Sequence, residues 1–323
     1  MKHEESDSDH SYLLMKKFTN FTKKIFIFFL IFNLTFVSSA QAAATFVDSF
    51  SVQTQENSPR GLAFNNDGTK MFVVGTAGKE VNEYTLSTGF DVSTASFVDG
   101  FDVSNEDSKP LGLAFNNDGT KMFVTGHTDD ELNEYTLSTG FDVSTATFVD
   151  GIAIDDGTPW GIAFNKDGTK MFVMANTNTN VNEYTLSTGF DVSTASFVDA
   201  FDVSDEESNP TGLTFNRNGT RLFVIGKGDN GIHEYTLSTG FDVSTATFVA
   251  SLSVNSQDGN ASDIAFNDDG TKMFFVGHSD DDVNEYTLSC AFKVTSSSTC
   301  DDPSTIKEVR GLIDAQIETA KNF

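Results

Sequence analysis

Two short runs of acidic residues are the groups in this sequence best suited to bind a cation. Their members are Asp129, Asp130 and Glu131 in the first run, and Asp280, Asp281 and Asp282 in the second. Carboxylate oxygens suit Ca²⁺, so calcium is the cofactor to consider here, although acidic runs are more often only solvated. His127 and His278 each precede a run by two residues, and we interpret both as solvated rather than as ligands of a shared metal.

Other candidates for ligand binding are spread along the chain. Trp160 is the only tryptophan, and its ring could stack on a sugar or another flat ligand; the alternative is a structural wedge. Three single aspartates complete the predicted ligand-binding set: Asp156, Asp205 and Asp263. So many acids predict a cationic ligand, or a neutral glycan held through bridging calcium.

A fivefold internal repeat must position these residues. The phrase GLAFNNDGTKMFV begins at Gly61 and again at Gly112, and edited copies begin at Gly161, Gly212 and Asp263. One period of about fifty residues contains four apolar segments of strand length, separated by Gly, Asp, Asn and Ser. The repeated Asp-Gly pair between the first two segments predicts a hairpin turn rather than a calcium loop.

Four strands in each of five repeats predict an all-β fold, a five-bladed β-propeller over residues 43–293. A strand of the outermost type stands at residues 46–52, before the first complete repeat, whereas the last repeat lacks one. The N-terminal strand should therefore close the last blade and leave no exposed sheet edge.

The repeats resemble those of secreted bacterial propellers of the YVTN and lactonase-like type. The stretch SPRGLAFNNDGTKMFVVG from Ser58 carries this resemblance, which extends over nearly all of residues 45–290. It implies that GLAF is the innermost strand of a blade, followed outward by MFV, NEYTL and FVDSFSV.

The five copies differ from one another in only two of their four connections. The NNDGTK turn and the STGFDVSTA connection hardly vary, and both should lie on one face of the propeller. The other two connections keep nearly the same length but change their chemistry, so the opposite face is predicted to bind a ligand. Unconstrained drift of exposed loops is the alternative.

The sequence favours a binding module over an enzyme. It contains no Gly-x-Ser-x-Gly elbow, no His-Glu-x-x-His motif and no phosphate-binding loop. Asp263 is the single charge in otherwise apolar inner strands, whereas an active site needs unlike groups that converge. We therefore predict a non-enzymatic binding or adhesion module; the alternative is a lactonase-like or other propeller hydrolase with a site in the channel.

The N-terminal 42 residues have the layout of a secretory signal peptide with an upstream extension. Lysines precede an apolar run, and Ala-Gln-Ala follows it. We expect removal near Ala43, no membrane span afterwards, and a secreted, periplasmic or cell-surface protein of a bacterium. A formal net charge of −27 argues against nucleic-acid and anionic-membrane partners. Glycans or surface proteins remain as partners, and we expect a monomer.

Residues 294–323 follow the last repeat. Cys290 and Cys300 are the only cysteines and should form a disulfide in an exported protein. The apolar spacing after Asp301 predicts a C-terminal amphipathic helix. This helix resembles the one that precedes the barrel of some autotransporters, which implies that the chain is a passenger fragment.

Overall fold

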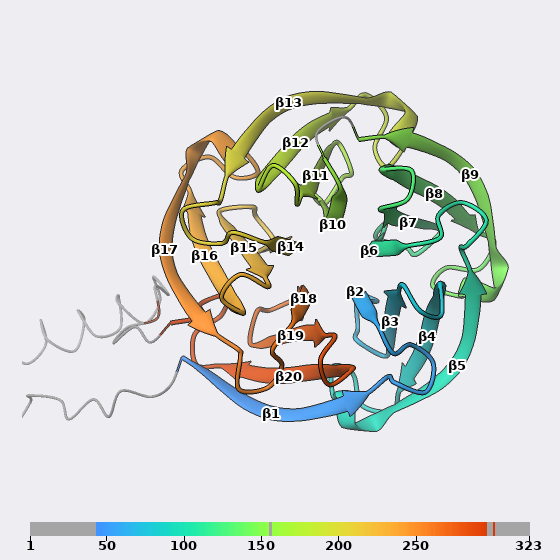
Figure 1. Ribbon diagram of the computed structural model, residues 1–323, viewed down its shortest axis with the longest axis horizontal. Helices are drawn as coiled ribbons and strands as arrows, with labels where there is room; N and C mark the ends of the chain where they lie inside the picture. Colours follow the sequence, from blue (N-terminus) through green and yellow to red (C-terminus); the bar gives the residue numbers. More distant parts are fainter. Residues whose placement is uncertain (1–42, 155–156, 296–299, 301–323) are drawn as a thin grey trace, which may run out of the picture. The chain divides into compact units, whose positions relative to one another are not determined.

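The computed structural model describes residues 43–154, 157–295 and 300. Within them, twenty β-strands form five four-stranded antiparallel sheets arranged in a ring (Figure 1). The predicted all-β, five-bladed propeller is confirmed.

Each of the first four blades consists of four consecutive strands. Blade 1 contains β2 (Pro59–Phe64), β3 (Lys70–Gly75), β4 (Glu80–Leu86) and β5 (Ala95–Asp102). Blade 2 contains β6 (Pro110–Phe115), β7 (Lys121–Gly126), β8 (Glu131–Leu137) and β9 (Ala146–Ala153). Blade 3 contains β10 (Pro159–Phe164), β11 (Lys170–Ala175), β12 (Asn180–Leu186) and β13 (Ala195–Asp202). Blade 4 contains β14 (Pro210–Phe215), β15 (Arg221–Gly226), β16 (Gly231–Leu237) and β17 (Ala246–Ser253).

The fifth blade joins the two ends of the repeat region. It contains β18 (Ala261–Phe266), β19 (Lys272–Gly277), β20 (Asp282–Leu288) and β1 (Ala44–Ser51). Strand β1 pairs antiparallel with β20 as the outermost strand, so the predicted closure by the N-terminal strand is confirmed. Figure 1 also shows the expected order within blades, with β2, β6, β10, β14 and β18 nearest the axis.

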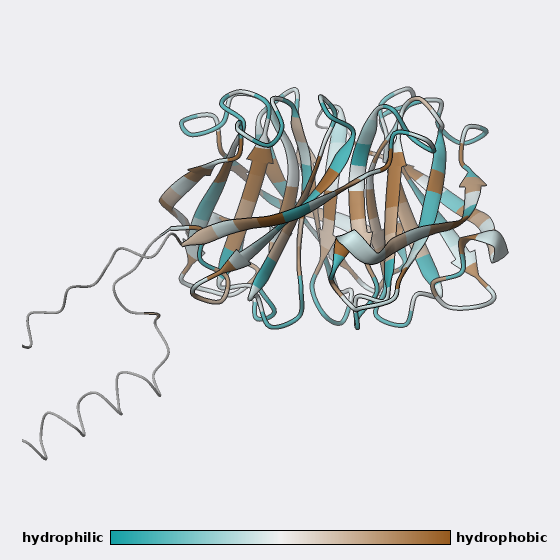
Figure 2. Ribbon diagram, turned by 90° about the horizontal axis from the view of Figure 1, so that it is seen from below, coloured by the Kyte–Doolittle hydropathy of each residue, from teal (hydrophilic) through white to brown (hydrophobic). Residues whose placement is uncertain are grey.

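The core lies between neighbouring blades. In strand β3 the residues from Met71 to Val74 are all fully buried, because this strand is covered by a blade on each side. Phe72, for example, packs on Phe115 of blade 2 with ring centroids 4.5 Å apart. Figure 2 shows hydrophobic residues along the strands and hydrophilic loops at both ends of the blades.

The constant loops form one face, as predicted. In blade 1 the turn glycine Gly68 has φ +70°, and a Cβ there would lie 2.3 Å from the ring of Phe90. The Phe90 N–H donates to the Gly68 carbonyl over 3.0 Å, so the turn and the following connection are packed together. Asp67 in this turn accepts hydrogen bonds from Thr69, which gives its carboxylate a turn-forming role.

A repeated ion pair explains why the constant sequence varies so little. Lys70 Nζ lies 2.7 Å from Glu83 Oε1 and donates to the Phe141 carbonyl of blade 2. The second oxygen of Glu83 accepts the N–H of Val143 over 3.1 Å, at the start of η2 (Val143–Thr145). Equivalent short helices are η1 (Val92–Thr94), η3 (Val192–Thr194) and η4 (Val243–Thr245). At the ring closure Glu285 accepts the N–H of Val92, so blade 5 is hydrogen-bonded to blade 1 in the same way.

Cys290 and Cys300 form a disulfide with Cα atoms 5.3 Å apart. The predicted signal region, residues 1–42, and the predicted helix after Asp301 lie outside the described residues. No helix within the described ranges is long and apolar enough to cross a membrane.

Candidate ligand-binding site

Buried carboxylates hold the variable loops together on one face. Glu56 is fully buried; its Oε1 accepts the N–H groups of Ser58 and Ala77, and its Oε2 accepts that of Gly78. These bonds connect the loop before β2 to the loop between β3 and β4. Acids at the same place in three other blades are Asp107, Glu207 and Asp258. Our sequence analysis missed this role, although an acid stands five residues before the inner-strand glycine or Asp263 in all five copies.

Two positions recur at equivalent places on this face of every blade. One is the residue before the inner-strand glycine or its Asp263 equivalent; these residues are Arg60, Leu111, Trp160, Thr211 and Ser262. The other is the first residue after β3 or its counterpart; these residues are Thr76, His127, Asn176, Lys227 and His278. The N–H of each residue in the second group donates to the carbonyl of the preceding loop, which gives the five positions equivalent geometry. None of these ten residues is acidic, even though the surrounding loops are rich in aspartate and glutamate.

A cavity of about 610 Å³ lies at this end of the axis, over blades 1 to 3. It is lined by Arg60, Thr76, Lys79, Ser108, Lys109, Leu111, His127, Thr158, Trp160 and Asn176. Its size suits a small ligand such as one or two sugar rings. Its lining combines the Trp160 and His127 rings with the basic side chains of Arg60, Lys79 and Lys109.

The cations around Trp160 are unusual because they make no ion pair with any carboxylate of the described residues. This holds for Arg60, Lys79 and Lys109 in the cavity and for Lys227 beside it, whereas Lys70 and its equivalents are all paired. Lys227 Nζ lies 4.0 Å from the centroid of the Trp160 ring, and Arg60 Cζ lies 5.7 Å from it. Both distances are within cation–π range.

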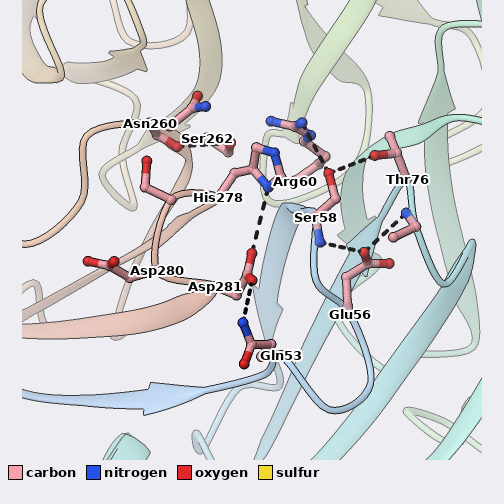
Figure 3. A network of polar contacts seen from close by, with 12 residues as sticks. Gln53, Glu56, Ser58, Arg60, Thr76, Asn260, Ser262, His278, Asp280 and Asp281 are labelled. Carbon is pink, nitrogen blue, oxygen red and sulfur yellow. Dashed lines mark hydrogen bonds and ion pairs between the residues drawn. The ribbon is translucent and has the colours of Figure 1, made fainter.

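Arg60 has an unfilled donor beside the cavity (Figure 3). One guanidinium nitrogen, Nη2, donates to Ser58 Oγ over 3.1 Å, and Ser58 Oγ is 2.8 Å from Thr76 Oγ1. The other, Nη1, is buried and has no hydrogen-bond partner. A buried donor without an acceptor costs free energy.

The positive charges also disturb one another. Burial, and then the charge of Arg60, lowers the pKa of Lys227 from 10.5 to about 7. Burial and Arg60 likewise lower the pKa of His278. An anion bound between these groups would favour their charged forms and so oppose the lowering of both pKa values by Arg60.

The position of Trp160 is compatible with both of the roles weighed for it in the sequence, a stacking platform and a structural wedge. It lines the cavity, and it also packs partly against the core between blades 3 and 4. Thr125 fixes its backbone, because the Thr125 hydroxyl donates to the Trp160 carbonyl and accepts the N–H of Gly112. The ring is therefore held in place before any ligand binds.

The predicted acids do not join Trp160 around the cavity. Those that the structure leaves exposed on loops are Asp129, Asp130, Asp205 and Asp280. Asp281 is buried, accepts a hydrogen bond from Gln53 and lies 3.6 Å from His278 Nδ1 (Figure 3). The last acid of each predicted run is the first residue of a strand: Glu131 begins β8, and Asp282 begins β20. Blade 1 separates the two runs, and Asp156 lies outside the described residues.

The predicted acids that the structure describes therefore form no ring around this cavity, while the predicted cationic ligand stays a prediction. No described acid is among the residues that line the cavity, whereas the basic residues Arg60, Lys79 and Lys109 do line it. The predicted acids Asp129, Asp130, Asp205 and Asp280 lie exposed on the variable loops, whereas the residues that line the cavity are neutral or basic.

Asp263 is buried rather than exposed at the channel mouth. It replaces the glycine of the other four inner strands and is 5% exposed. Its two oxygens accept the N–H groups of Leu62 in blade 1 and of Ile264, each over 2.9 Å. Burial raises its pKa to about 7. The carboxylate thus joins the last blade to the first.

No model of a protein family matches the sequence, and no curated protein matches it. Solved structures are similar in backbone. A functionally unknown protein from Desulfotomaculum acetoxidans is 14% identical, with a TM-score of 0.45 over 74% of this chain and 72% of that one. A protein described as a candidate 6-phosphogluconolactonase, from Bacteroides uniformis, is 12% identical, with a TM-score of 0.46 over 75% of this chain and 68% of that one. A second such candidate, from Bacteroides fragilis, is 11% identical with the same TM-score and coverage. Similarity at this level assigns no activity to this chain.

Proposed function

We propose that this chain is an exported, non-enzymatic binding module that recognises an acidic carbohydrate or a similar small anion through the Trp160 cavity. The observation that carries the proposal is that Arg60, Lys79 and Lys109 converge on one cavity and form no ion pair with a carboxylate of the described residues, in a chain of net charge −27. Such an exception to the overall charge is expected where an anion must bind.

The cavity offers complementary contacts to a charged sugar. The Trp160 ring presents a flat apolar surface to the C–H face of a pyranose. The Arg60 guanidinium lines the cavity and can donate to a carboxylate or sulfate, and charge-assisted hydrogen bonds are among the stronger ones. The lysines Lys79 and Lys109 add positive charge from neighbouring blades.

The role of Asp263 supports binding over hydrolysis. Both carboxylate oxygens already accept backbone N–H groups, and the side chain is buried between inner strands. A general acid or base must reach the proton that it transfers, and Asp263 has no such access in this position. Export and surface display remain part of the proposal, resting on the composition of residues 1–42.

A glycan screen tests this function. Acidic, neutral and amino sugars should be presented to the wild-type chain and to Trp160→Ala, with Asp118→Ala on the constant face as the matched control. We expect selective binding of acidic sugars, lost in Trp160→Ala and kept in Asp118→Ala, once circular dichroism has shown that both variants are folded. Preference for amino sugars, or equal loss in both variants, would contradict the proposal.

A further inference from the structure

One blade departs from the repeat inside its third strand. Four blades have a buried asparagine at this position: Asn82, Asn133, Asn182 and Asn284. Blade 4 has His233 instead, with 2% of its surface exposed. An imidazole nitrogen is a good ligand for transition metals and zinc, which an amide is not.

The buried loop carboxylate next to His233 also differs from its equivalents. In blades 1, 2 and 5 both oxygens of this carboxylate accept N–H groups from the loops. In blade 4 Glu207 Oε1 accepts the N–H groups of Asn209 and Gly228. Glu207 Oε2 is buried, has no hydrogen-bond partner among the described residues and lies 3.7 Å from His233 Nε2. The loop-bridging role thus uses only one oxygen here and leaves the other facing an imidazole.

A third potential ligand comes from the loop between β15 and β16. Asp229 Oδ1 lies 3.3 Å from His233 Nε2, and the side chain is 55% exposed. The ligand atoms of Glu207, Asp229 and His233 all lie within 4.8 Å of one another. Ligands about 2.1 Å from a tetrahedral Zn²⁺ lie roughly 3.4 Å apart, which the separations of 3.3 and 3.7 Å approach.

We propose that Glu207, Asp229 and His233 form a binding site for a divalent metal of the zinc class, with water completing the coordination. One nitrogen and two carboxylate oxygens suit Zn²⁺, Mn²⁺ or Co²⁺ better than Ca²⁺, which takes six to eight oxygen ligands. Asp229 is the exposed ligand and provides the route from solvent, while Glu207 and His233 are fixed by the strands and loops of the blade.

The competing interpretation is a protonated His233 that pairs with the two carboxylates without any metal. Burial alone would lower the pKa of His233, but Glu207 and Asp229 outweigh it and raise this pKa. A proton and a metal ion would then compete for Nε2. The two interpretations differ in metal binding, which can be measured directly.

The matched variants come from the repeat itself. His233→Asn installs the residue that the other four blades have, so it should preserve the fold while removing the nitrogen ligand. Asp229→Asn removes the exposed carboxylate ligand. Asp129→Asn changes the equivalent residue of blade 2, where residue 133 is asparagine, and serves as the control for surface acidity.

The test is calorimetric titration of the chelator-treated chain with Zn²⁺, Mn²⁺ and Ca²⁺, together with its melting temperature. We expect one Zn²⁺ per chain, and a melting temperature raised by roughly 5 °C or more at ~100-fold excess over the dissociation constant. We also expect at least ~10-fold weaker binding in His233→Asn and Asp229→Asn, with Asp129→Asn unchanged. No Zn²⁺ or Mn²⁺ binding by the wild type, or equal binding by His233→Asn, would overturn the site and leave only the ion pair.

Discussion

The ammonium of Lys227 in blade 4 lies 4.0 Å from the centroid of the Trp160 ring in blade 3. This contact holds a lysine in a partly buried place where burial and Arg60 lower its pKa to about 7. The fold therefore places an amine beside the cavity where its charged form is disfavoured, and such perturbed groups are typical of functional sites.

Replacing Lys227 should stabilise the ligand-free protein in a pH-dependent way. Because the folded-state pKa of about 7 is below the ordinary value of 10.5, the unfolded chain holds a proton that the folded chain lacks between these values. Wild-type stability should therefore rise with pH across this window relative to Lys227→Met. We expect the variant to be more stable by on the order of 1–2 kcal/mol at pH 6, after discounting for solvent screening, with the difference gone near pH 10. Urea unfolding at both pH values checks this, and parallel pH profiles would contradict the lowered pKa.

Asp263 should give the wild type a pH dependence of the opposite sign. Its folded-state pKa is raised to about 7, so the folded chain binds a proton that the unfolded chain has lost between roughly pH 4 and pH 7. The associated stability is present below this window and lost as pH rises through 7. The free energy of unfolding of the wild type should thus fall relative to that of Asp263→Asn between pH 5 and pH 8. A constant difference between the two proteins would show that Asp263 ionises normally.

Removing β1 should affect the whole ring. A chain that begins at Val52 loses every pairing of β1 with β20 and exposes the edge of blade 5. We expect a melting temperature at least ~10 °C lower, or loss of cooperative unfolding. A chain that begins at Ala43 is the control. An unchanged melting temperature in the shorter chain would mean that β1 is not needed for closure.

The Lys70–Glu83 pair should be a principal link between blades 1 and 2. Glu83→Ala removes the carboxylate that accepts from both the Lys70 ammonium and the Val143 N–H. We expect this loss to lower the free energy of unfolding by about 2–4 kcal/mol. Asp99→Ala, at an exposed position of β5, should change this free energy by less than ~0.5 kcal/mol. Equal effects in denaturant unfolding would remove the special role of Glu83.

Sequence repetition predicted the fold well because every blade must meet the same packing demands. Phe72, Glu83 and Gly68 each serve contacts that recur around the ring, and recurrence within one chain makes them visible. The early strand at residues 46–52 was enough to predict closure, because the last repeat lacked its outermost strand.

The candidate site was predicted less completely because its determinants are exceptions to the repeat. The acids of the variable loops outnumber the cations, yet no described acid lines the cavity, and a count of charges does not separate the lining residues from the rest of the loops. Glu207 and His233 are 26 positions apart, on a loop and a strand, so only the folded blade brings their side chains together. Trp160 was found because a single tryptophan stands out in any composition.

The most direct test of the account compares two ligands that differ only in charge. Calorimetric titration should use a glucuronate-containing disaccharide and its neutral glucose counterpart, with wild type, Arg60→Met and, as the control, Asp129→Asn. We predict at least ~10-fold tighter binding of the acidic sugar by the wild type and by Asp129→Asn, weakening as salt rises, with most of the preference lost in Arg60→Met. Equal affinity of the wild type for both sugars, or a preference that survives in Arg60→Met, would contradict an anion-binding site at Trp160.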